Sequence, residues 1–230
     1  MSLHNDIARI ANLMGDATRA SILIALMDGR ALTAGELAIQ ANISPQTASN
    51  HLNKLSQAKL IVCESSGRHR YYKIASPDVA KALESISLLT AAPDLASLHS
   101  KKLDKDICFA RSCYDHLAGT LGVKITLGLV TKKYLILHSN KFSITNDGKL
   151  FFDAMGINCE GLLQSRRKFA NPCFDWTERK YHLAGSLGTA LLDYFINHRL
   201  FMRSKYKPRV ILLTSKGRQW LKNTLDIVTP

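Results

Sequence analysis

Two pairs of cysteine and histidine residues in the second half of the chain are well suited to metal or thiol chemistry. Cys113 stands three positions before His116, and Cys173 precedes His182. The spacing of Cys113 and His116 predicts that both side chains lie on one face of a helix. Thiolate and imidazole groups bind zinc or a soft metal, and a histidine can activate a neighbouring thiol. If the four side chains converge, they form a metal site or a thiol-redox site; otherwise they are only structural.

Both histidines open a motif that occurs twice. His116-Leu-Ala-Gly-Thr-Leu-Gly122 recurs as His182-Leu-Ala-Gly-Ser-Leu-Gly188, and Ser143-Ile-Thr-Asn-Asp-Gly-Lys149 pairs with Leu212-Leu-Thr-Ser-Lys-Gly-Arg218. We expect two repeats, about 108–157 and 173–226. Each is predicted as a helix, a second helix or turn (Gly128–Leu137; Asp193–Met202), a strand and a helix, an order that resembles a reduced winged-helix unit. Because glycine costs about 1 kcal/mol inside a helix, the motif indicates either close helix packing or a cleft that binds an effector.

Composition and charge limit the function classes. The 230 residues, 46% hydrophobic and 21% charged, suit one large or two small globular domains. The sequence shows neither a membrane-length apolar run nor an export signal, which predicts a cytoplasmic protein without membrane contact. A net charge of +13 favours a polyanionic partner, although an ordinary basic surface is the alternative. The five cysteines are scattered without a Cys-x-x-Cys pair, so we expect thiols rather than a disulfide framework.

Capping signals in the first ninety residues predict a helix-turn-helix. Thr33 and Glu36 form a capping box, and Ser44 precedes Pro45 as the N-cap of a second helix. A short helix, a three-residue turn and a capped helix are typical of this motif. The second helix turns Ala48, Leu52 and Leu55 to one side. The opposite side carries Gln46, Thr47, Asn50, Asn53 and Lys54. Their amides and hydroxyl can hydrogen-bond base edges, which favours DNA recognition; the alternative is a polar surface without a binding role.

A basic hairpin follows the second helix. Alternating residues predict strands at 60–64 and 70–74 with a turn at 65–67, and the tip carries Arg68, His69 and Arg70. Cys63 is expected to be buried in the first strand. A hairpin behind a recognition helix is a winged helix, whose wing meets phosphates or the minor groove. The next helix has an apolar stripe, from Val79 to Leu89, that either forms a dimer seam or packs on the C-terminal half. Residues 91–94 are the predicted linker.

Four motifs in this order resemble the ArsR/SmtB-type family of bacterial transcriptional regulators, over about residues 5–92. They are Gly15-Asp-Ala-Thr-Arg19, Leu32-Thr-Ala-Gly-Glu-Leu37, Ser44-Pro-Gln-Thr-Ala-Ser-Asn-His-Leu52 and Gly67-Arg-His-Arg-Tyr-Tyr72. The resemblance implies a homodimeric repressor that leaves its operator when an inducer binds. It assigns DNA recognition to Ser44, Gln46, Thr47, Ser49, Asn50, His51 and Lys54, and wing contacts to Arg68, His69 and Arg70. Residues 33–42 contain no cysteine and 77–91 no histidine, so metal sensing at the family's usual sites is not supported.

The predicted fold class is mainly α with small β-hairpins (α+β). Residues 1–92 form a winged helix-turn-helix domain that binds double-stranded DNA. Residues 93–230 form a domain of two winged-helix-like repeats for effector sensing or dimerisation. The effector is a small molecule, a metal or an oxidant, and Cys113, His116, Cys173 and His182 are the candidates to sense it. A nonspecific basic architectural protein is the alternative. A thiol-dependent enzyme is a further one, but no oxyanion or phosphate-binding loop accompanies the thiols, so no catalytic residue is assigned.

Overall fold

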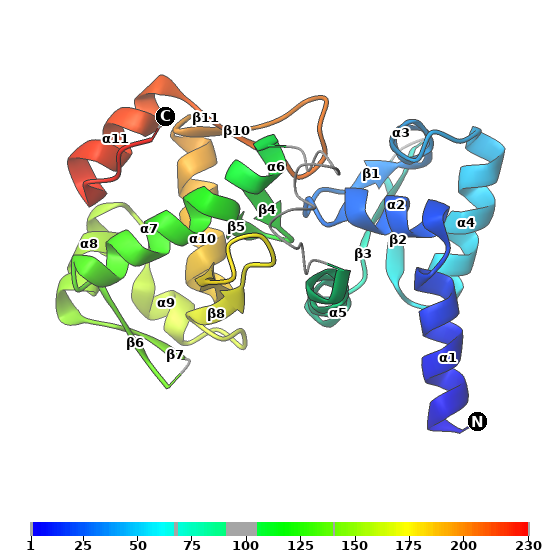
Figure 1. Cartoon of the computed structure of the whole chain (residues 1–230), viewed down its shortest axis with the longest axis horizontal. Helices are drawn as coiled ribbons and strands as arrows, with labels where there is room; N and C mark the ends of the chain where they lie inside the picture. Colours follow the sequence, from blue (N-terminus) through cyan, green and yellow to red (C-terminus); the bar gives the residue numbers. More distant parts are fainter. Residues whose placement is uncertain (1, 67–68, 91–104, 140, 230) are drawn as a thin grey trace, which may run out of the picture. The chain divides into compact units, whose positions relative to one another are not determined.

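The computed structural model describes residues 2–66, 69–90, 105–139 and 141–229 and divides the chain into two compact units (Figure 1). The first unit is Met1–Ser87 and the second is Leu88–Pro230. Helices with small antiparallel hairpins confirm the predicted α+β class. The predicted linker at 91–94 lies outside the described residues. Within the described residues, no helix is long and apolar enough to cross a membrane.

The first unit is a winged helix-turn-helix. Its elements are α1 (Leu3–Met14), α2 (Ala17–Leu26), β1 (Leu32–Thr33), α3 (Ala34–Gln40), α4 (Pro45–Gln57), β2 (Ile61–Ser66), β3 (His69–Ile74) and α5 (Pro77–Thr90). Helices α2, α3 and α4 pack around buried Leu23, Leu37 and Leu52. The three strands form an antiparallel sheet in the order β1-β3-β2.

The predicted caps explain where α3 and α4 begin. The Thr33 side chain accepts a hydrogen bond from the Glu36 amide, and the Glu36 carboxylate accepts one from the Thr33 amide at 2.7 Å. The Ser44 hydroxyl accepts a hydrogen bond from the Thr47 amide at 3.1 Å, with Pro45 at the first helical position. Both contacts satisfy amides that a helix start leaves without partners. The capping predictions are therefore confirmed.

The wing is longer than the sequence indicated. Ser65 and Ser66 continue β2 and pair with Arg70 and His69 of β3, so the predicted turn at 65–67 begins too early. Cross-strand hydrogen bonding extends the strands into this polar stretch. Cys63 is exposed rather than buried, on β2 at one edge of the sheet.

The second unit repeats one order of elements, two strands, a helix, two strands and a helix. The first run is β4 (Arg111–Cys113), β5 (His116–Ala118), α7 (Gly119–Thr131), β6 (Leu135–His138), β7 (Lys141–Ile144) and α8 (Asn146–Ala154). The second run is β8 (Asn171–Phe174), β9 (Tyr181–Ala184), α10 (Gly185–Asn197), β10 (Phe201–Arg203), β11 (Ile211–Leu213) and α11 (Ser215–Leu225). Helix α6 (Lys105–Phe109) precedes the first run, and α9 (Cys159–Leu163) joins the two.

The order within each run corrects the sequence prediction. Each run begins with a hairpin before the predicted helix. The segments Gly128–Leu137 and Asp193–Met202 hold a helix end, a turn and the start of a strand, so the turn, not a second helix, is the alternative that holds. The helices begin at Gly119 and Gly185, where positive φ angles turn the chain sharply out of the preceding strand. Gly119 and Gly185 thus start the helices, whereas the second glycine of each motif, Gly122 or Gly188, lies inside.

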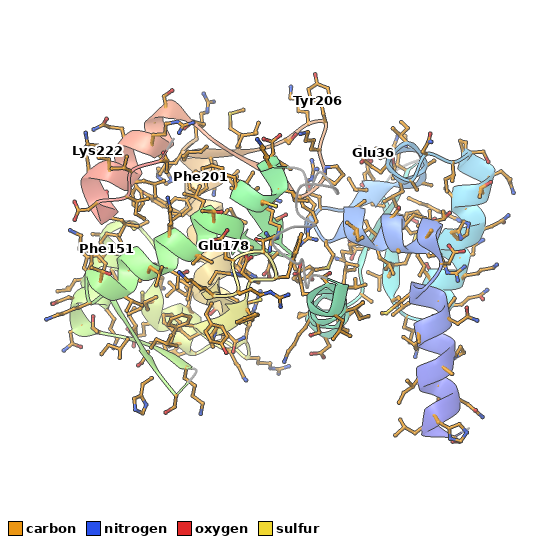
Figure 2. All side chains as sticks on the ribbon, viewed as in Figure 1. Glu36, Phe151, Glu178, Phe201, Tyr206 and Lys222 are labelled. Atoms are coloured by element: carbon orange, nitrogen blue, oxygen red, sulfur yellow. The ribbon has the colours of Figure 1, made fainter. Side chains whose placement is uncertain are left out.

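The two runs share one hydrophobic core. Helix α7 packs against β9 of the second run, and α10 packs against β5 of the first. Leu121, Leu187 and Phe195 are fully buried between them, and Figure 2 shows Phe201 inside the same unit. The cavity between the two glycine motifs measures about 10 Å³, room for one water at most. Close packing is therefore what the motif produces at this contact, which leaves no room for an effector.

Candidate DNA-binding face and Cys-His cluster

The outward side of α4 carries most of the predicted base-contacting side chains. Gln46, Asn50 and Lys54 are exposed, whereas Ala48 and Leu52 face the core. Ser44 and Thr47 begin the same face, and their hydroxyl oxygens lie 2.8 Å apart. Ser49 is half-buried at the edge of this face. Exposed amide groups next to a lysine can hydrogen-bond base edges and a phosphate without rearrangement of the helix.

His51 differs from its neighbours on α4. Its side chain is half-buried, and Nδ1 lies 3.8 Å from Oδ1 of Asp16, the N-cap residue of α2. The imidazole is thus turned toward the unit's own α2, which makes it less accessible to DNA than Asn50.

The wing places two of its three predicted contacts on β3. His69 and Arg70 are exposed there, and Arg68 lies outside the described residues. Lys73 on the same strand forms an ion pair with Glu64 of β2, so its charge is partly neutralised. Arg70 is the described cation of this hairpin best exposed to meet a phosphate.

The four predicted Cys and His ligands converge in the second unit. Cys113 and His116 are directly opposite each other on β4 and β5, and Cys173 and His182 are opposite each other on β8 and β9. Cross-strand partners project from the same face of a hairpin, so each hairpin presents one thiol and one imidazole together. Strands β5 and β9 are neighbours, which brings the two hairpins into contact.

The prediction that Cys113 and His116 share a helix is wrong. Tyr114 and Asp115 form a tight turn between the strands, with Tyr114 at a positive φ of 62°. A two-residue turn and one helical turn both bring residues three apart onto one side, so the spacing alone does not distinguish them.

The cluster is compact and buried. One ligand atom from each of Cys113, His116, Cys173 and His182 lies within 4.8 Å of all the others. The two sulfur atoms are 3.8 Å apart, and the Nε2 atoms of the two histidines are 3.2 Å apart. Cys113, His116 and His182 are buried, and Cys173 is half-buried. None of the five cysteines, all within the described residues, forms a disulfide bond.

Each histidine has a carboxylate beside its other ring nitrogen. His116 Nδ1 lies 3.2 Å from Asp115 Oδ1, and Arg167 binds both oxygens of Asp115 through its two terminal nitrogens. His182 Nδ1 lies 3.2 Å from Asp175 Oδ2, an ion-pair distance without the alignment of a full hydrogen bond. In both histidines the Nε2 atom is consequently the one that faces the centre of the cluster.

Asp175 is held by a dense set of donors. Its Oδ2 accepts hydrogen bonds from Arg111 at 3.0 Å and from the Gly119 amide at 2.7 Å. Its Oδ1 accepts bonds from the Thr177 amide, the Thr177 hydroxyl and the Glu178 amide. Arg111 and Asp175 are both fully buried, and the guanidinium lies 4.5 Å from the centre of the Trp176 ring. The position of Asp175, and through it that of His182, is therefore tightly defined.

These contacts set the charges around the cluster. Burial opposes ionisation of Asp175, but the His182 contact and the charge of Arg111 outweigh it and hold the pKa of that carboxyl far below its usual range. Asp115 is likewise buried, yet His116 and Arg167 hold its pKa well below the usual range. Burial also opposes protonation of His116, but the Cys113 thiolate and Asp115 raise the pKa of its imidazole to about 9. The cluster thus favours positive charge at its centre.

The four predicted ligands did not include the charged residues around them, Asp115, Asp175, Arg111 and Arg167. One signal was available, because both runs contain a cysteine, an aromatic residue and an aspartate in succession: Cys113-Tyr-Asp115 and Cys173-Phe-Asp175. Arg111 and Arg167 carry no comparable local signal.

Known helix-turn-helix transcriptional regulators are similar to the first unit, and one of them is similar to nearly the whole chain. A helix-turn-helix domain family matches residues 14–64. The uncharacterized HTH-type transcriptional regulator YdfF of Bacillus subtilis is 45% identical over 225 residues, which is 98% of this chain and 99% of YdfF. The HTH-type transcriptional regulator CmtR of Mycobacterium tuberculosis is 34% identical over 88 residues, 38% of this chain and 74% of CmtR. The transcriptional repressor SdpR of Bacillus subtilis is 41% identical over 61 residues, 26% of this chain and 67% of SdpR.

Proposed function

The chain belongs to the ArsR-type family of helix-turn-helix transcriptional regulators, and we propose that it is a homodimeric repressor of a specific operator. The observation that carries the proposal is the exposed amide-rich face of α4 beside the basic β2–β3 hairpin. In this proposal α4 enters the major groove, where Gln46 and Asn50 read bases, and the hairpin contacts the adjacent backbone. A net charge of +13 for the chain supports association with DNA.

Apolar side chains on the first unit support a dimer. All residues of α1 are at least partly exposed, including Leu3 and Ile7. Ile86 of α5 is 44% exposed, and Leu89, on the part of α5 that continues beyond this unit, is 84% exposed. Isolated surface leucines are ordinary, but two helices with exposed apolar residues provide material for an interface with a second copy. The α5 stripe is therefore proposed as part of a dimer seam.

Repression and release by an effector complete the proposal. SdpR, which matches part of this chain, is a transcriptional repressor, and this supports the same direction of control. The second unit has a buried Cys-His cluster that an effector can address, while α4 and the hairpin belong to the first unit. An effector that binds the DNA-free protein more tightly than the DNA-bound protein would lower operator affinity. By linkage, the factor by which it does so equals the factor by which DNA lowers the affinity for the effector.

Two substitutions separate base reading from phosphate binding. Asn50→Ala removes an exposed amide from α4 without disturbing the helix, since alanine favours helices. It should cost about 1–3 kcal/mol of binding to the preferred sequence and little on scrambled DNA. Arg70→Ala should weaken binding to both DNAs alike and reduce the salt slope by about one.

The measurement is fluorescence anisotropy with both duplexes at two salt concentrations. Lys222→Ala is the control for loss of charge alone, because Lys222 is exposed on α11 of the second unit (Figure 2). Equal losses on every DNA from Asn50→Ala and Arg70→Ala would contradict the roles proposed here and favour a nonspecific architectural protein.

A further inference from the structure

We propose that Cys113, His116, Cys173 and His182 form a closed, four-coordinate zinc site that joins the two runs of the second unit. Only its regulatory use, as the place where the effector acts, rests on the proposed function.

The separations of the ligand atoms fit a tetrahedral Zn²⁺ ion. Zinc binds cysteine sulfur at about 2.3 Å and histidine nitrogen at about 2.0–2.1 Å. In a regular tetrahedron these bond lengths place two sulfurs about 3.8 Å apart and two nitrogens about 3.3–3.4 Å apart. The observed separations are 3.8 Å between the sulfurs of Cys113 and Cys173 and 3.2 Å between the Nε2 atoms of His116 and His182. The S–S and N–N separations therefore already match a zinc-sized tetrahedron. The sulfur–nitrogen separations, at most 4.8 Å, compare with about 3.6 Å in that tetrahedron, so zinc binding would draw the two hairpins slightly together.

The histidines are oriented as metal ligands usually are. A ligating imidazole generally points one nitrogen at the metal while a carboxylate or carbonyl fixes the other. Asp115 stands beside Nδ1 of His116 and Asp175 beside Nδ1 of His182, so both Nε2 atoms face inward. Arg167 and Arg111 in turn fix the two aspartates. This arrangement is present twice, once in each run, although the two hairpins have turns of different length.

The donor set selects the class of metal. Two thiolates and two imidazoles favour zinc or a soft ion over magnesium and calcium, which prefer oxygen ligands. A tetrahedral set of two sulfurs and two nitrogens is typical of Zn²⁺, and four protein ligands leave no position for a substrate. The site thus suits a structural or sensory metal rather than a catalytic one.

The position of the site gives it a structural consequence. Each run supplies one cysteine and one histidine, so neither run alone can hold the ion with more than two ligands. Gly188 of α10 makes room for this contact, because a Cβ atom there would lie 3.3 Å from the Cβ of His116. Metal binding is therefore coupled to the assembly of both runs, and zinc should stabilise the second unit as a whole.

The test begins with the full chain purified under reducing conditions without chelator. We expect about one zinc per chain by elemental analysis. After zinc removal, Co²⁺ should restore one equivalent, with the intense visible bands of tetrahedral cobalt and near-ultraviolet absorption from two thiolate ligands. Cys113→Ser and His182→Gln should each lower the zinc content at least tenfold. Cys159→Ser is the matched control, since Cys159 is a buried thiol of the same unit outside the cluster, and it should keep its zinc.

Three results would overturn the zinc site. The first is wild-type protein that neither contains zinc nor takes it up at equimolar concentration. The second is cobalt-loaded wild-type protein with a weak octahedral spectrum and no thiolate absorption. The third is Cys113→Ser protein that retains its zinc. The first two use wild-type protein, so they hold even if a variant fails to fold. Operator binding is measured separately by anisotropy on the same samples. Zinc binding without DNA binding would overturn the proposed function and support the zinc site. DNA binding without zinc binding would support the proposed function and overturn the zinc site.

Discussion

The buried Arg111–Asp175 ion pair allows a sharp test of how the second unit is held together. Both side chains are fully buried, so removal of one partner leaves the other's charge without compensation. In Asp175→Asn the buried guanidinium loses the negative charge that compensates it and keeps neutral partners, among them the Ile107 carbonyl at 3.4 Å and the Thr177 hydroxyl at 3.2 Å. The expected cost is about 3–5 kcal/mol, the usual range for a broken buried pair.

Arg111→Met should cost less. The Asp175 carboxylate would still accept hydrogen bonds from the amides of Gly119, Thr177 and Glu178. The loss is then mainly that of one hydrogen bond between charged groups, about 1.5–3 kcal/mol. We therefore expect Asp175→Asn to destabilise the second unit more than Arg111→Met.

Urea unfolding followed by tryptophan fluorescence measures this directly. Both tryptophans of the chain, Trp176 and Trp220, belong to the second unit, so the signal reports on that unit. With a slope of about 2 kcal/mol per molar urea, Asp175→Asn should lower the midpoint by about 1.5–2.5 M. Chelator in all samples removes any contribution from metal. Asp147→Asn is the control, because it makes the same change at an exposed position on α8. It should shift the urea midpoint by less than about 0.5 M. A reversed order of the two variants, or a cost below about 1 kcal/mol for Asp175→Asn, would refute this reasoning.

Two further predictions concern packing and thiol reactivity. Gly188→Ala would place a Cβ atom 2.5 Å from the Leu183 carbonyl oxygen, so we expect a loss of about 1–3 kcal/mol in the second unit. At Gly35 of α3 an added Cβ atom would meet no atom within 4 Å, so Gly35→Ala should be neutral or stabilising. Thermal melting followed by circular dichroism compares the two variants. Equal losses of stability would contradict the packing argument. Burial raises the pKa of the Cys159 thiol to about 11, whereas Cys63 is exposed. Iodoacetamide at pH 8 should therefore alkylate Cys63 first, and mass spectrometry showing Cys159 modified at the same rate in folded protein would contradict the placement of this thiol.

The first unit could be predicted closely because its signals are local. The Thr33–Glu36 capping box and the Ser44-Pro45 start each lie within four residues, and the apolar spacing of α4 decides which face is buried. The wing strands were longer than expected because pairing across the hairpin, rather than strand propensity, keeps Ser65 and Ser66 in β2.

The second unit was less predictable because its key contacts are distant in sequence. The repeated motif singled out His116 and His182, and Cys113 and Cys173 were chosen as the thiols that precede them. The structure brings the four side chains together. The hairpin at Tyr114 and Asp115 lacks the glycine or asparagine that usually marks a tight turn, so the helical interpretation was equally compatible with the spacing. The pairing of Arg111 with Asp175 depends on how β4 and the loop after β8 meet, and no single segment contains that information.

The most direct test of sequence-specific DNA binding starts from a random pool of duplexes. The wild-type chain selects bound sequences, and anisotropy then compares the recovered sequence with a scrambled duplex of equal length at two salt concentrations. We expect a common recovered motif that is bound about a thousandfold or more tightly than scrambled DNA, with the preference retained at the higher salt. Recovery of unrelated sequences, all bound equally and all released by salt, would contradict it.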